Sequence, residues 1–599
     1  MNANAFLSVA NSAAGKRWEL RPANDRHVAT LAQGHGLPEV AARALSARGV
    51  APNEAESFLN PTLRALLPDP SRFKDMDKAA ERLARAIRDG DSVAVFGDYD
   101  VDGAASAALL IRFFRDLGRP LRLYVPDRLK EGYGPNADAM RLLAAEGVRL
   151  VVTVDCGITS FAALAAARDA GLETLVVDHH AAEPELPAAL AVVNPNRLDE
   201  DRAYGHICAA AVAYLLVIAV NRVLRDGGWY AGRQAPDLMA LLDVVGLATV
   251  CDVMPLTGLN RALVAQGLKV MAKRGNAGLA ALADVAGVKE RPDAYHLGYI
   301  LGPRVNAGGR VGASDLGARL LSCDDGLEAQ ELARRLNEHN GERQEIEQAV
   351  LEEALAQVAL CAGANAEDGA LVAASEGWHP GVVGIVAGRL KERFNRPACA
   401  VAIERTGEGK LVGKGSGRSV KGFDLGGAVI AARQEGLPLG GGGHPMAAGF
   451  TIAPERIDDF RRFLAARMAA AGAGGAIDLT PRLELDGALS IHGANMALVD
   501  ALAKLAPFGA GNPEPRFALT DVRVARADVV GKNHVRCILT SPSGGRLKAV
   551  AFRALDEDLG QLLLNSGGVN LHVAGALRAD RWQGREEPQM FIDDAARAG

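Results

Sequence analysis

Between residues 92 and 195 the sequence alternates short β-branched runs with stretches of helical spacing. The runs, in order, are SVAVFGD, LRLYVPD, LVVTVDCG, TLVVDHH and AVVNPN, and the helical stretches between them are ASAALLIRFFRDLG, ADAMRLLAAEG and FAALAAARDAG. Strands that alternate with helices of this length predict βαβ units and therefore an α/β fold with a doubly wound parallel sheet. Near-continuous apolar runs are typical of strands that are buried on both faces.

The rest of the chain predicts further domains, as expected for 599 residues at ~100–200 per domain. Residues 1–70 predict a small helical lead-in, and the doubly wound domain with the helices that follow it spans 71–325. Residues 326–362, rich in Glu and Arg, predict one long helix that is either a rigid connector or a solvated bundle helix. Residues 363–470 predict a second α/β domain. After a Gly/Ala linker, about five short strands over 482–599 predict a small β-barrel such as an OB-fold.

Composition limits the class of protein and its location. The net charge is only −5, so any nucleic-acid binding must use local basic surface. The seven cysteines include no CxxC pair, which argues against a thiolate zinc site and a disulfide framework. The N-terminus has no signal-peptide pattern, and the apolar run 207–220 is shorter than the ~20 residues that span a bilayer. We expect a monomeric cytoplasmic protein without a membrane segment.

Acidic residues and two histidines lie where the predicted strands and an apolar stretch end. In an open parallel sheet, ligands bind just beyond the carboxyl ends of the strands. One Asp at such an end is usually an N-cap or a turn residue, but several carboxylates in one crevice would repel each other strongly. The residues in question are Asp98, Asp100, Asp102, Asp155, Asp178, His179, His180 and Asp252.

Divalent cations would relieve this repulsion. Carboxylate and imidazole ligands without cysteine suit Mn²⁺ or Mg²⁺ better than structural zinc. Two such cations ~3.5–4 Å apart clamp a phosphate in phosphatases and nucleases. The residues therefore predict a two-metal centre for hydrolysis of phosphate esters.

Four motifs at these positions resemble those of a known family. GDYDVDG, VDCG, DHH and CDVMPL, in this order, are similar to the motifs of the DHH phosphoesterases, which include RecJ exonucleases, oligoribonucleases, cyclic-dinucleotide phosphodiesterases and a class of inorganic pyrophosphatase. PRVNAGGRVG, GWHPGVVGIVAGRL, GSGRS and GGGGHPMAAGF resemble motifs of RecJ and of the DHH-associated domain. PFGAGNPEPRF is similar to the start of the RecJ OB domain. The resemblance covers roughly residues 70–599.

The resemblance implies which residues hold the two metals. Asp100 and Asp155 would bind one cation. The other would be bound by Asp102, Asp155, His179 and Asp252, so that Asp155 bridges the pair.

The resemblance also implies roles beside these ligands. Asp98 would be a ligand or the partner of a ligand, and Asp178 would orient a ligand. His180 would contact the scissile phosphate or the leaving oxygen. Some relatives have a histidine where this chain has Phe96, so we expect the first metal to be bound more weakly here.

Two glycine-rich segments, GKGSGRS at 413–419 and GGGGHPMAAG at 440–449, predict contacts with nucleotide phosphates. Glycines let backbone N–H groups approach a phosphate, and an arginine can grip it through two parallel hydrogen bonds. A tight turn is the alternative for each segment. By resemblance, Ser416, Arg418 and His444 line the nucleotide path, and Arg304 and Arg310 are further phosphate candidates.

Residues 516–553 contain eight Lys/Arg and two acids, an excess that suits single-strand binding on an OB-fold. The alternative is a solvated sheet face whose aromatic residues, such as Phe517 and Phe552, lie in the core. For Trp378 and His379 two interpretations are also open, namely stacking on bases and packing in the core. The basic residues that we expect to contact DNA are Arg516, Lys532, Arg536 and Lys548.

The resemblance implies a single-stranded-DNA-specific 5′→3′ exonuclease that acts in DNA repair and recombination, with a single-strand-binding protein and a RecQ-type helicase as partners. Two alternatives remain open. One is a phosphodiesterase for small oligonucleotides or cyclic dinucleotides, against which the basic C-terminal region argues. The other is a non-catalytic Cdc45-like scaffold, which would have lost metal ligands that this chain retains.

Overall fold

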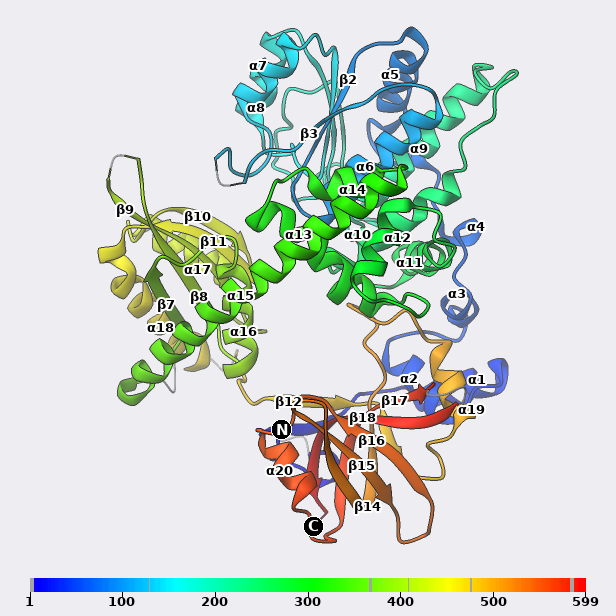
Figure 1. Cartoon of the computed structure of the whole chain (residues 1–599), viewed down its shortest axis with the longest axis vertical. Coiled ribbons are helices and arrows are strands. Elements are labelled where there is room, and N and C mark those ends of the chain that lie inside the picture. Colours follow the sequence, from blue (N-terminus) through cyan, green and yellow to red (C-terminus); the bar gives the residue numbers. More distant parts are fainter. Residues whose placement is uncertain are drawn as a thin grey trace. The chain divides into compact units, whose positions relative to one another are not determined.

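The computed structural model describes residues 5–598 except 129, 366–368, 408, 474–476 and 582–585. The chain forms two compact units, Met1–Asn337 with Arg482–Gly599, and Glu338–Pro481 (Figure 1). The helix α15, Gly326–Asn365, begins in the first unit and ends in the second. No helix of the described residues is both long enough and apolar enough to cross a membrane.

The first unit contains a parallel sheet of five strands in the order β3-β2-β4-β5-β6. The predicted α/β class is thereby confirmed. β3 lies on one side of β2 and β4 on the other, so the strand order reverses at β2. Such a reversal is the point where open α/β sheets bind ligands. The strands are β2 Val93–Gly97, β3 Arg122–Tyr124, β4 Leu150–Val154, β5 Glu173–Val177 and β6 Ala191–Val193.

Helices cover both faces of this sheet, which explains why its strands are apolar throughout. Val93 and Val95 of β2 pack in one core with α5, α6 and α9, while Ala94 and Phe96 pack in another with α7. Figure 1 shows α7 and α8 on one side of the strands and α5 and α9 on the other. The helices are α5 Met76–Asp89, α6 Val101–Asp116, α7 Ala137–Ala145, α8 Phe161–Asp169 and α9 Ala209–Asp226.

A helical subdomain follows the sheet and completes its main core. Leu242 of α10, Leu263 of α11 and Leu320 of α14 are buried with the sheet residues. The elements are η3 Leu238–Leu241, α10 Leu242–Cys251, α11 Gly258–Met271, α12 Ala277–Val285, the π-helix η4 His296–Leu301, α13 Gly302–Val311 and α14 Leu316–Ser322.

The N-terminal region packs against the C-terminal strands. Leu31 and Leu45 share one core with Leu519, Leu539 and Leu571. The first strand, β1, pairs in parallel with β12 of the C-terminal part. The elements are η1 Phe6–Ser8, β1 Arg17–Leu20, α1 Asp25–His35, α2 Glu39–Ala47, α3 Ala55–Leu59, α4 Leu63–Leu66 and η2 Pro70–Arg72.

The C-terminal strands form a sheet in the order β13-β14-β15-β16-β18-β17, and β17 also pairs with β14. Two helices lie among these strands in the sequence. The elements are β12 Arg482–Leu485, β13 Gly487–Leu489, α19 Met496–Ala503, β14 Phe517–Val530, β15 His534–Thr540, β16 Arg546–Ala551, α20 Asp558–Leu564, β17 Leu571–Asp580 and β18 Glu587–Arg597.

A buried arginine joins three distant segments of this unit. Arg261 of α11 is 1% exposed, and its guanidinium lies 3.8 Å from the ring centroid of Phe58. It donates hydrogen bonds to the carbonyl oxygens of Phe58 (2.7 Å), Ala506 (2.7 Å) and Pro507 (3.4 Å). Burial lowers the pKa of Arg261 to about 10. Because peptide carbonyls satisfy this cation, α11, α3 and the segment before β14 are held together.

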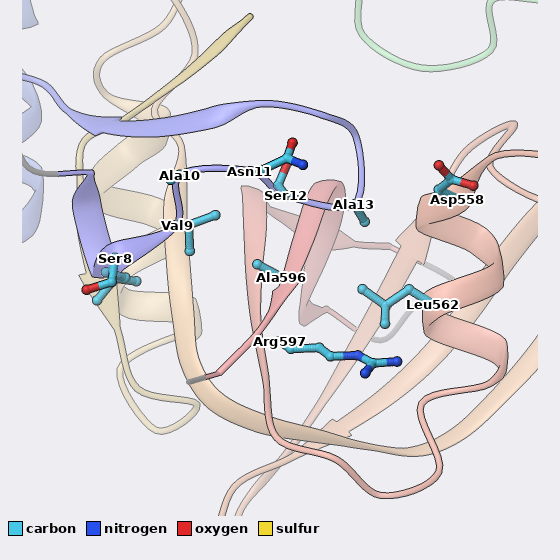
Figure 2. Close-up of a pocket in the computed structure, with 11 residues that line it drawn as sticks. Ser8, Val9, Ala10, Asn11, Ser12, Ala13, Asp558, Leu562, Ala596 and Arg597 are labelled. Atoms are coloured by element: carbon cyan, nitrogen blue, oxygen red, sulfur yellow. The ribbon is translucent and has the colours of Figure 1, made fainter.

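A cavity of about 610 Å³ lies where residues 8–13 cross the end of β18 and face α20 (Figure 2). Its charged lining residues are Asp558 and Arg597. Neither belongs to a cluster of potential metal ligands among the residues described. This cavity is therefore separate from the predicted chemistry.

The second unit has a five-stranded sheet in the order β10-β11-β9-β8-β7, in which only β7 and β8 run parallel. The segment GKGSGRS was open to interpretation as a turn, but it forms part of β9. The elements are β7 Leu371–Glu376, α16 Val383–Phe394, β8 Ala398–Arg405, β9 Leu411–Arg418, α17 Leu425–Gln434, β10 Pro438–His444, β11 Ala447–Ile452, η5 Pro454–Arg456 and α18 Ile457–Ala473.

Candidate metal centre

The loop between β2 and α6 brings three carboxylates to the edge of the sheet. Asp100 is the N-cap of α6 and accepts hydrogen bonds from the backbone N–H of Asp102 (2.9 Å) and Gly103 (3.1 Å). A Cβ on Gly103 would lie 2.5 Å from the carbonyl oxygen of Asp98, so only glycine permits this tight loop. Both carboxylate oxygens of Asp102 accept backbone N–H groups from the start of α9.

Asp155 and the Asp178-His179-His180 segment follow β4 and β5. Asp155 has a φ of 61°, a left-handed conformation that is uncommon outside glycine and often marks functional sites. Its Oδ1 lies 3.2 Å from Nε2 of His179. Asp178 accepts hydrogen bonds from the backbone N–H of His179 (2.7 Å) and His180 (3.1 Å), and its Oδ1 lies 2.8 Å from Nδ1 of His180. Asp178 therefore fixes the geometry of both histidines.

Asp252 completes the cluster from the C-terminal end of α10. Its Oδ2 lies 3.6 Å from Nε2 of His179, and Asp102 Oδ2 lies 3.7 Å from the same nitrogen. Among the described residues, three groups of potential metal ligands result, each with ligand atoms within 4.8 Å of one another. They are Asp98, Asp100 and Asp155; Asp102, His179 and Asp252; and Asp155, His179 and His180.

The donor set fits divalent cations. Asp98 Oδ1, Asp155 Oδ1 and Asp252 Oδ2 are buried and accept no hydrogen bond within the described residues, although His179 Nε2 lies 3.2 Å from Asp155 Oδ1 and 3.6 Å from Asp252 Oδ2. Burial, reinforced by the neighbouring carboxylates, raises the pKa of Asp98 and of Asp252 to about 8 each and that of Asp155 well above its ordinary value. Unpartnered buried carboxylates are costly, and oxygen and imidazole ligands suit Mn²⁺ or Mg²⁺.

The raised pKa values of these carboxyl groups predict that the effect of metal on the stability of the fold depends on pH. Without metal, Asp98 and Asp252 have pKa values of about 8 in the fold, above the ordinary value of 3.8, so they lower the stability of the fold increasingly as the pH rises from about 4 to about 8. Because a cation must displace these protons, its apparent affinity rises with pH. We expect Mn²⁺ to raise Tm more at pH 8 than at pH 6 in thermal unfolding.

The control for this measurement is an Asp155→Asn variant, which removes a charged ligand. It should show a smaller rise in Tm with Mn²⁺ at pH 8. A rise for the parent protein that is equal at both pH values, or larger at pH 6, would contradict the interpretation.

The loop after β3 also reaches the site, and sequence reasoning missed it. The hydroxyl of Tyr133 donates to the carbonyl oxygen of Asp155 (3.1 Å), and its ring lies edge-on to His180 at 6.1 Å. The guanidinium of Arg128 lies 5.0 Å from the ring centroid of Tyr99 and lowers the pKa of Asp98, against the larger effect of burial. These residues could have been predicted from the sequence, because the loop after β3 begins at the same edge of the sheet as the loops that carry the aspartates.

Helix α13 carries the PRVNAGGRV motif and packs on the loop between β2 and α6. Oδ1 of Asn306 accepts a hydrogen bond from the backbone N–H of Val101 (3.1 Å), and Gly309 approaches the backbone of Tyr99. Arg310 is close enough to lower the pKa of Tyr99, although burial raises that pKa to about 12 overall. Arg304 donates to Asn337 Oδ1 (3.0 Å) and to a backbone carbonyl oxygen.

Phe96 lies in the core and offers no ligand at the position where some relatives have a histidine. Its ring stacks on that of Tyr124 at 5.1 Å and 18°. The side chain is fully buried in the core on the α7 face of the sheet.

Three known protein domains match successive parts of this chain. The N-terminal domain of the DHH family matches residues 92–247, the DHHA1 domain matches 367–470, and the RecJ OB domain matches 485–594. The single-stranded-DNA-specific exonuclease RecJ of Escherichia coli is 35% identical over 93% of this chain and 96% of its own length. The Bacillus subtilis protein of the same name is 33% identical over 97% of this chain and 71% of its own.

The chain belongs to the RecJ family. Solved structures agree with this assignment. RecJ from Thermus thermophilus in complex with Mn²⁺ has a TM-score of 0.78 at 31% identity, and covers 97% of this chain and 79% of its own. The same protein in complex with Mg²⁺ gives a TM-score of 0.72 at 30% identity over 97% and 78%. The predicted family, the metal-dependent hydrolase class and the Mn²⁺ or Mg²⁺ cofactor are confirmed.

The DHHA1 domain places the predicted nucleotide-binding residues at one end of its sheet. Arg418 of β9 is in register with Ala447 of β11, which is in register with His444 of β10. Nη1 of Arg418 donates to Ser416 Oγ (3.2 Å). A Cβ on Gly384, in the first turn of α16, would lie 3.1 Å from that Oγ, so this glycine lets the helix lie close.

Two glycines of β9 are required by packing, whereas the predicted phosphate contact of this segment stays a prediction. A Cβ on Gly415 would meet the ring of Phe450, and one on Gly417 would meet Leu425. Alternate glycines of β9 therefore make room for core side chains, while Ser416 and Arg418 lie on the opposite face. Trp378 is buried and donates its Nε1–H to Glu353 (2.7 Å), as expected for core packing.

Acidic neighbours partly neutralise the basic surface predicted for the OB domain. Arg516 pairs with Asp593 (2.8 Å), Arg536 with Asp528 (3.5 Å) and Lys548 with Glu587 (2.7 Å). Most of these acids lie outside the sequence window 516–553 that suggested a basic surface. Lys532 is exposed in the turn after β14, Phe517 is buried in the core, and Phe552 is exposed.

Proposed function

We propose that this protein is a single-stranded-DNA-specific exonuclease that releases mononucleotides in the 5′→3′ direction. The observation that carries the proposal is the group of buried, unpartnered carboxylate oxygens of Asp98, Asp155 and Asp252, within the described residues, beside the reversal of strand order. The names of the Escherichia coli and Bacillus subtilis relatives support the substrate. The direction of cleavage rests on the resemblance alone.

We assign the metal ligands as the family resemblance implies them. Asp100 and Asp155 would hold one cation, and Asp102, Asp155, His179 and Asp252 the other. When bound, the cations would supply positive charge to the scissile phosphate and activation of the attacking water. Asp155 belongs to two of the ligand groups, in keeping with a bridging role.

His180 is suited to a contact with the reacting phosphate. Burial opposes its protonation, but the ion pair with Asp178 outweighs burial and raises the pKa of His180 to about 9. The ion pair with Asp178 thus favours the protonated form of the ring in the metal-free protein. A protonated imidazole can donate a hydrogen bond to a phosphate oxygen or a proton to the leaving oxygen.

The two alternatives are less well supported. A phosphodiesterase for dinucleotides has no need of an OB domain, which binds a strand over several nucleotides. A scaffold has no need of the seven potential metal ligands, which lie together here. The resemblance also suggests cooperation with a single-strand-binding protein and a RecQ-type helicase in the cytoplasm.

A comparison of substrates tests the proposal. The protein is incubated with Mn²⁺ and labelled single-stranded DNA, duplex DNA, a dinucleotide or pyrophosphate. We expect stepwise release of mononucleotides from the 5′ end of the single strand, and much slower attack on the duplex. Faster hydrolysis of the dinucleotide or of pyrophosphate than of the strand would favour the small-substrate alternative.

A further inference from the structure

Two neighbouring tyrosines form an open aromatic surface on the first unit. Tyr295 directly precedes the π-helix η4, and Tyr299 lies within it. Tyr295 is 55% exposed and Tyr299 is 74% exposed. Their rings stack on each other with centroids 5.2 Å apart and an interplanar angle of 28°. Single exposed aromatic residues are ordinary, but a stacked pair that remains this exposed indicates a binding surface.

The backbone beneath the two rings is held in place. His296, between them in sequence, is 7% exposed. Its Nδ1 lies 2.7 Å from Asp293 Oδ1, and its Nε2 lies 3.2 Å from Glu290 Oε1. Short π-helical segments occur frequently at functional sites. A ligand that stacks on rings fixed in this way loses less free energy to ordering the protein.

The π-helix is also attached to the helix that ends at the metal centre. The thiol of Cys251, the last residue of α10, donates to the carbonyl oxygen of Leu297 (3.4 Å). Gly302, at the start of α13, approaches the same sulfur so closely that a Cβ would lie 2.4 Å from it. Asp252, the next residue after Cys251, is one of the candidate metal ligands. The tyrosines therefore stand on an element packed against the metal-binding helix.

On the N-terminal side of the tyrosine pair, Asp293 influences the charge of a residue in the OB domain. A hydrogen bond with Glu514 is the main cause of the raised pKa of Arg578 in β17, and Asp293 contributes to it as well. Asp293 therefore lies near Arg578. The guanidinium of Arg578 lies 4.8 Å from the ring centroid of Phe591, and this ring lies 5.5 Å from that of Phe552. The OB domain thus has an aromatic pair of its own, Phe552 and Phe591.

We propose that Tyr295 and Tyr299 form a stacking platform for bases of a single strand between the OB domain and the metal centre. This inference rests on the proposed exonuclease function and adds a base-binding site to it. Every base has an aromatic face, so stacking binds a strand without preference for sequence. A duplex hides those faces, and the platform therefore favours single strands. Lys289 and Arg291, exposed just before the platform, offer charge to the backbone phosphates.

Binding measurements without metal test the platform apart from catalysis. Fluorescence anisotropy in EDTA would follow a labelled strand of roughly 20 nucleotides. With one ring removed, Tyr299→Ala should weaken binding roughly tenfold, and the double change with Tyr295→Ala by up to about 100-fold. Tyr299→Phe should bind as the parent does, because the ring remains. Leu142→Ala, at a 47% exposed apolar residue of α7, is the matched control and should have no effect.

Abasic substitutions in the strand locate the contact. With the parent protein, a missing base at one or two positions should weaken binding, and the same positions should lose their effect with the double variant. Unchanged affinity of the double variant, or an unchanged abasic profile, would overturn the platform and leave the tyrosines to a protein partner. The proposed function fails separately if the parent binds strands in this way and hydrolyses none with Mn²⁺.

Discussion

An Asp155→Asn variant should lose at least about three orders of magnitude in kcat/KM on single-stranded DNA, equivalent to ~4 kcal/mol of transition-state stabilisation. Asp155 contributes to two of the three ligand groups, and its buried Oδ1 has no hydrogen-bond partner in the described part of the chain. Asparagine has nearly the same volume and tolerates the left-handed φ of 61°. The fold should therefore remain while both cations are held more weakly. A time course of mononucleotide release with Mn²⁺ measures the effect.

A second aspartate with a positive φ provides the control. Asp521 has a φ of 51° and belongs to none of the ligand groups found among the described residues. Asp521→Asn should degrade the strand at the parent's rate. Thermal unfolding of both variants in EDTA checks that the fold is retained. If Asp155→Asn kept activity within tenfold of the parent, the bridging role of Asp155 would be wrong.

We expect the protein to degrade 5′-phosphorylated strands faster than 5′-hydroxyl strands, and Arg418→Ala to remove this preference. Burial lowers the pKa of Arg418, and no carboxylate forms an ion pair with it among the residues that the structure describes. A desolvated guanidinium beside the Ser416 hydroxyl is suited to a terminal phosphate, and such a charge-assisted pair is worth roughly 1.5–3 kcal/mol. We expect degradation of 5′-phosphorylated strands to slow by about 10- to 100-fold, with little change for 5′-hydroxyl strands.

The chain offers two comparisons for this measurement. Arg418→Lys should restore the preference only in part, because an ammonium group cannot make two parallel hydrogen bonds. Lys414, on the same strand, is paired with Glu404 (3.2 Å), and Lys414→Ala should keep the preference. Time courses on both substrates give the result. An equal slowing of both by Arg418→Ala would make this residue a general backbone contact.

The metal centre could be predicted because its signals are local in the sequence. Each ligand from Asp98 to His180 follows a strand whose apolar run is visible, and a parallel sheet brings such ends together. Asp252 was predicted for a similar reason, although it ends a helix. The family resemblance supplied the division of ligands between the two metals.

Features that depend on distant neighbours could not be predicted in this way. The glycines of β9 were interpreted as a phosphate cradle, yet Gly415 is covered by Phe450, which lies on another strand. The charge excess near residue 530 ignored acids such as Asp593 and Glu587, which enter the OB surface from β18. A window of sequence cannot show which charges a fold will place side by side.

The tyrosine pair escaped notice for a related reason. HLGYIL has the composition of an ordinary buried helix, yet it forms a π-helix in which His296 is buried and Tyr299 is exposed. Helical periodicity assumes 3.6 residues per turn, so a local change of winding alters which side chains are exposed.

The shared core of the two ends of the chain has a consequence for synthesis on the ribosome. The apolar faces of α1 and α2, with Leu31 and Leu45, are covered by residues such as Leu519 and Leu571, and Arg261 obtains carbonyl partners from Ala506 and Pro507. At about 5–20 residues per second, the roughly 470 residues between Leu45 and Leu519 take on the order of 24–95 s to translate. Throughout that interval the apolar faces of α1 and α2 stay uncovered. Such faces are suitable binding sites for a chaperone that binds nascent chains.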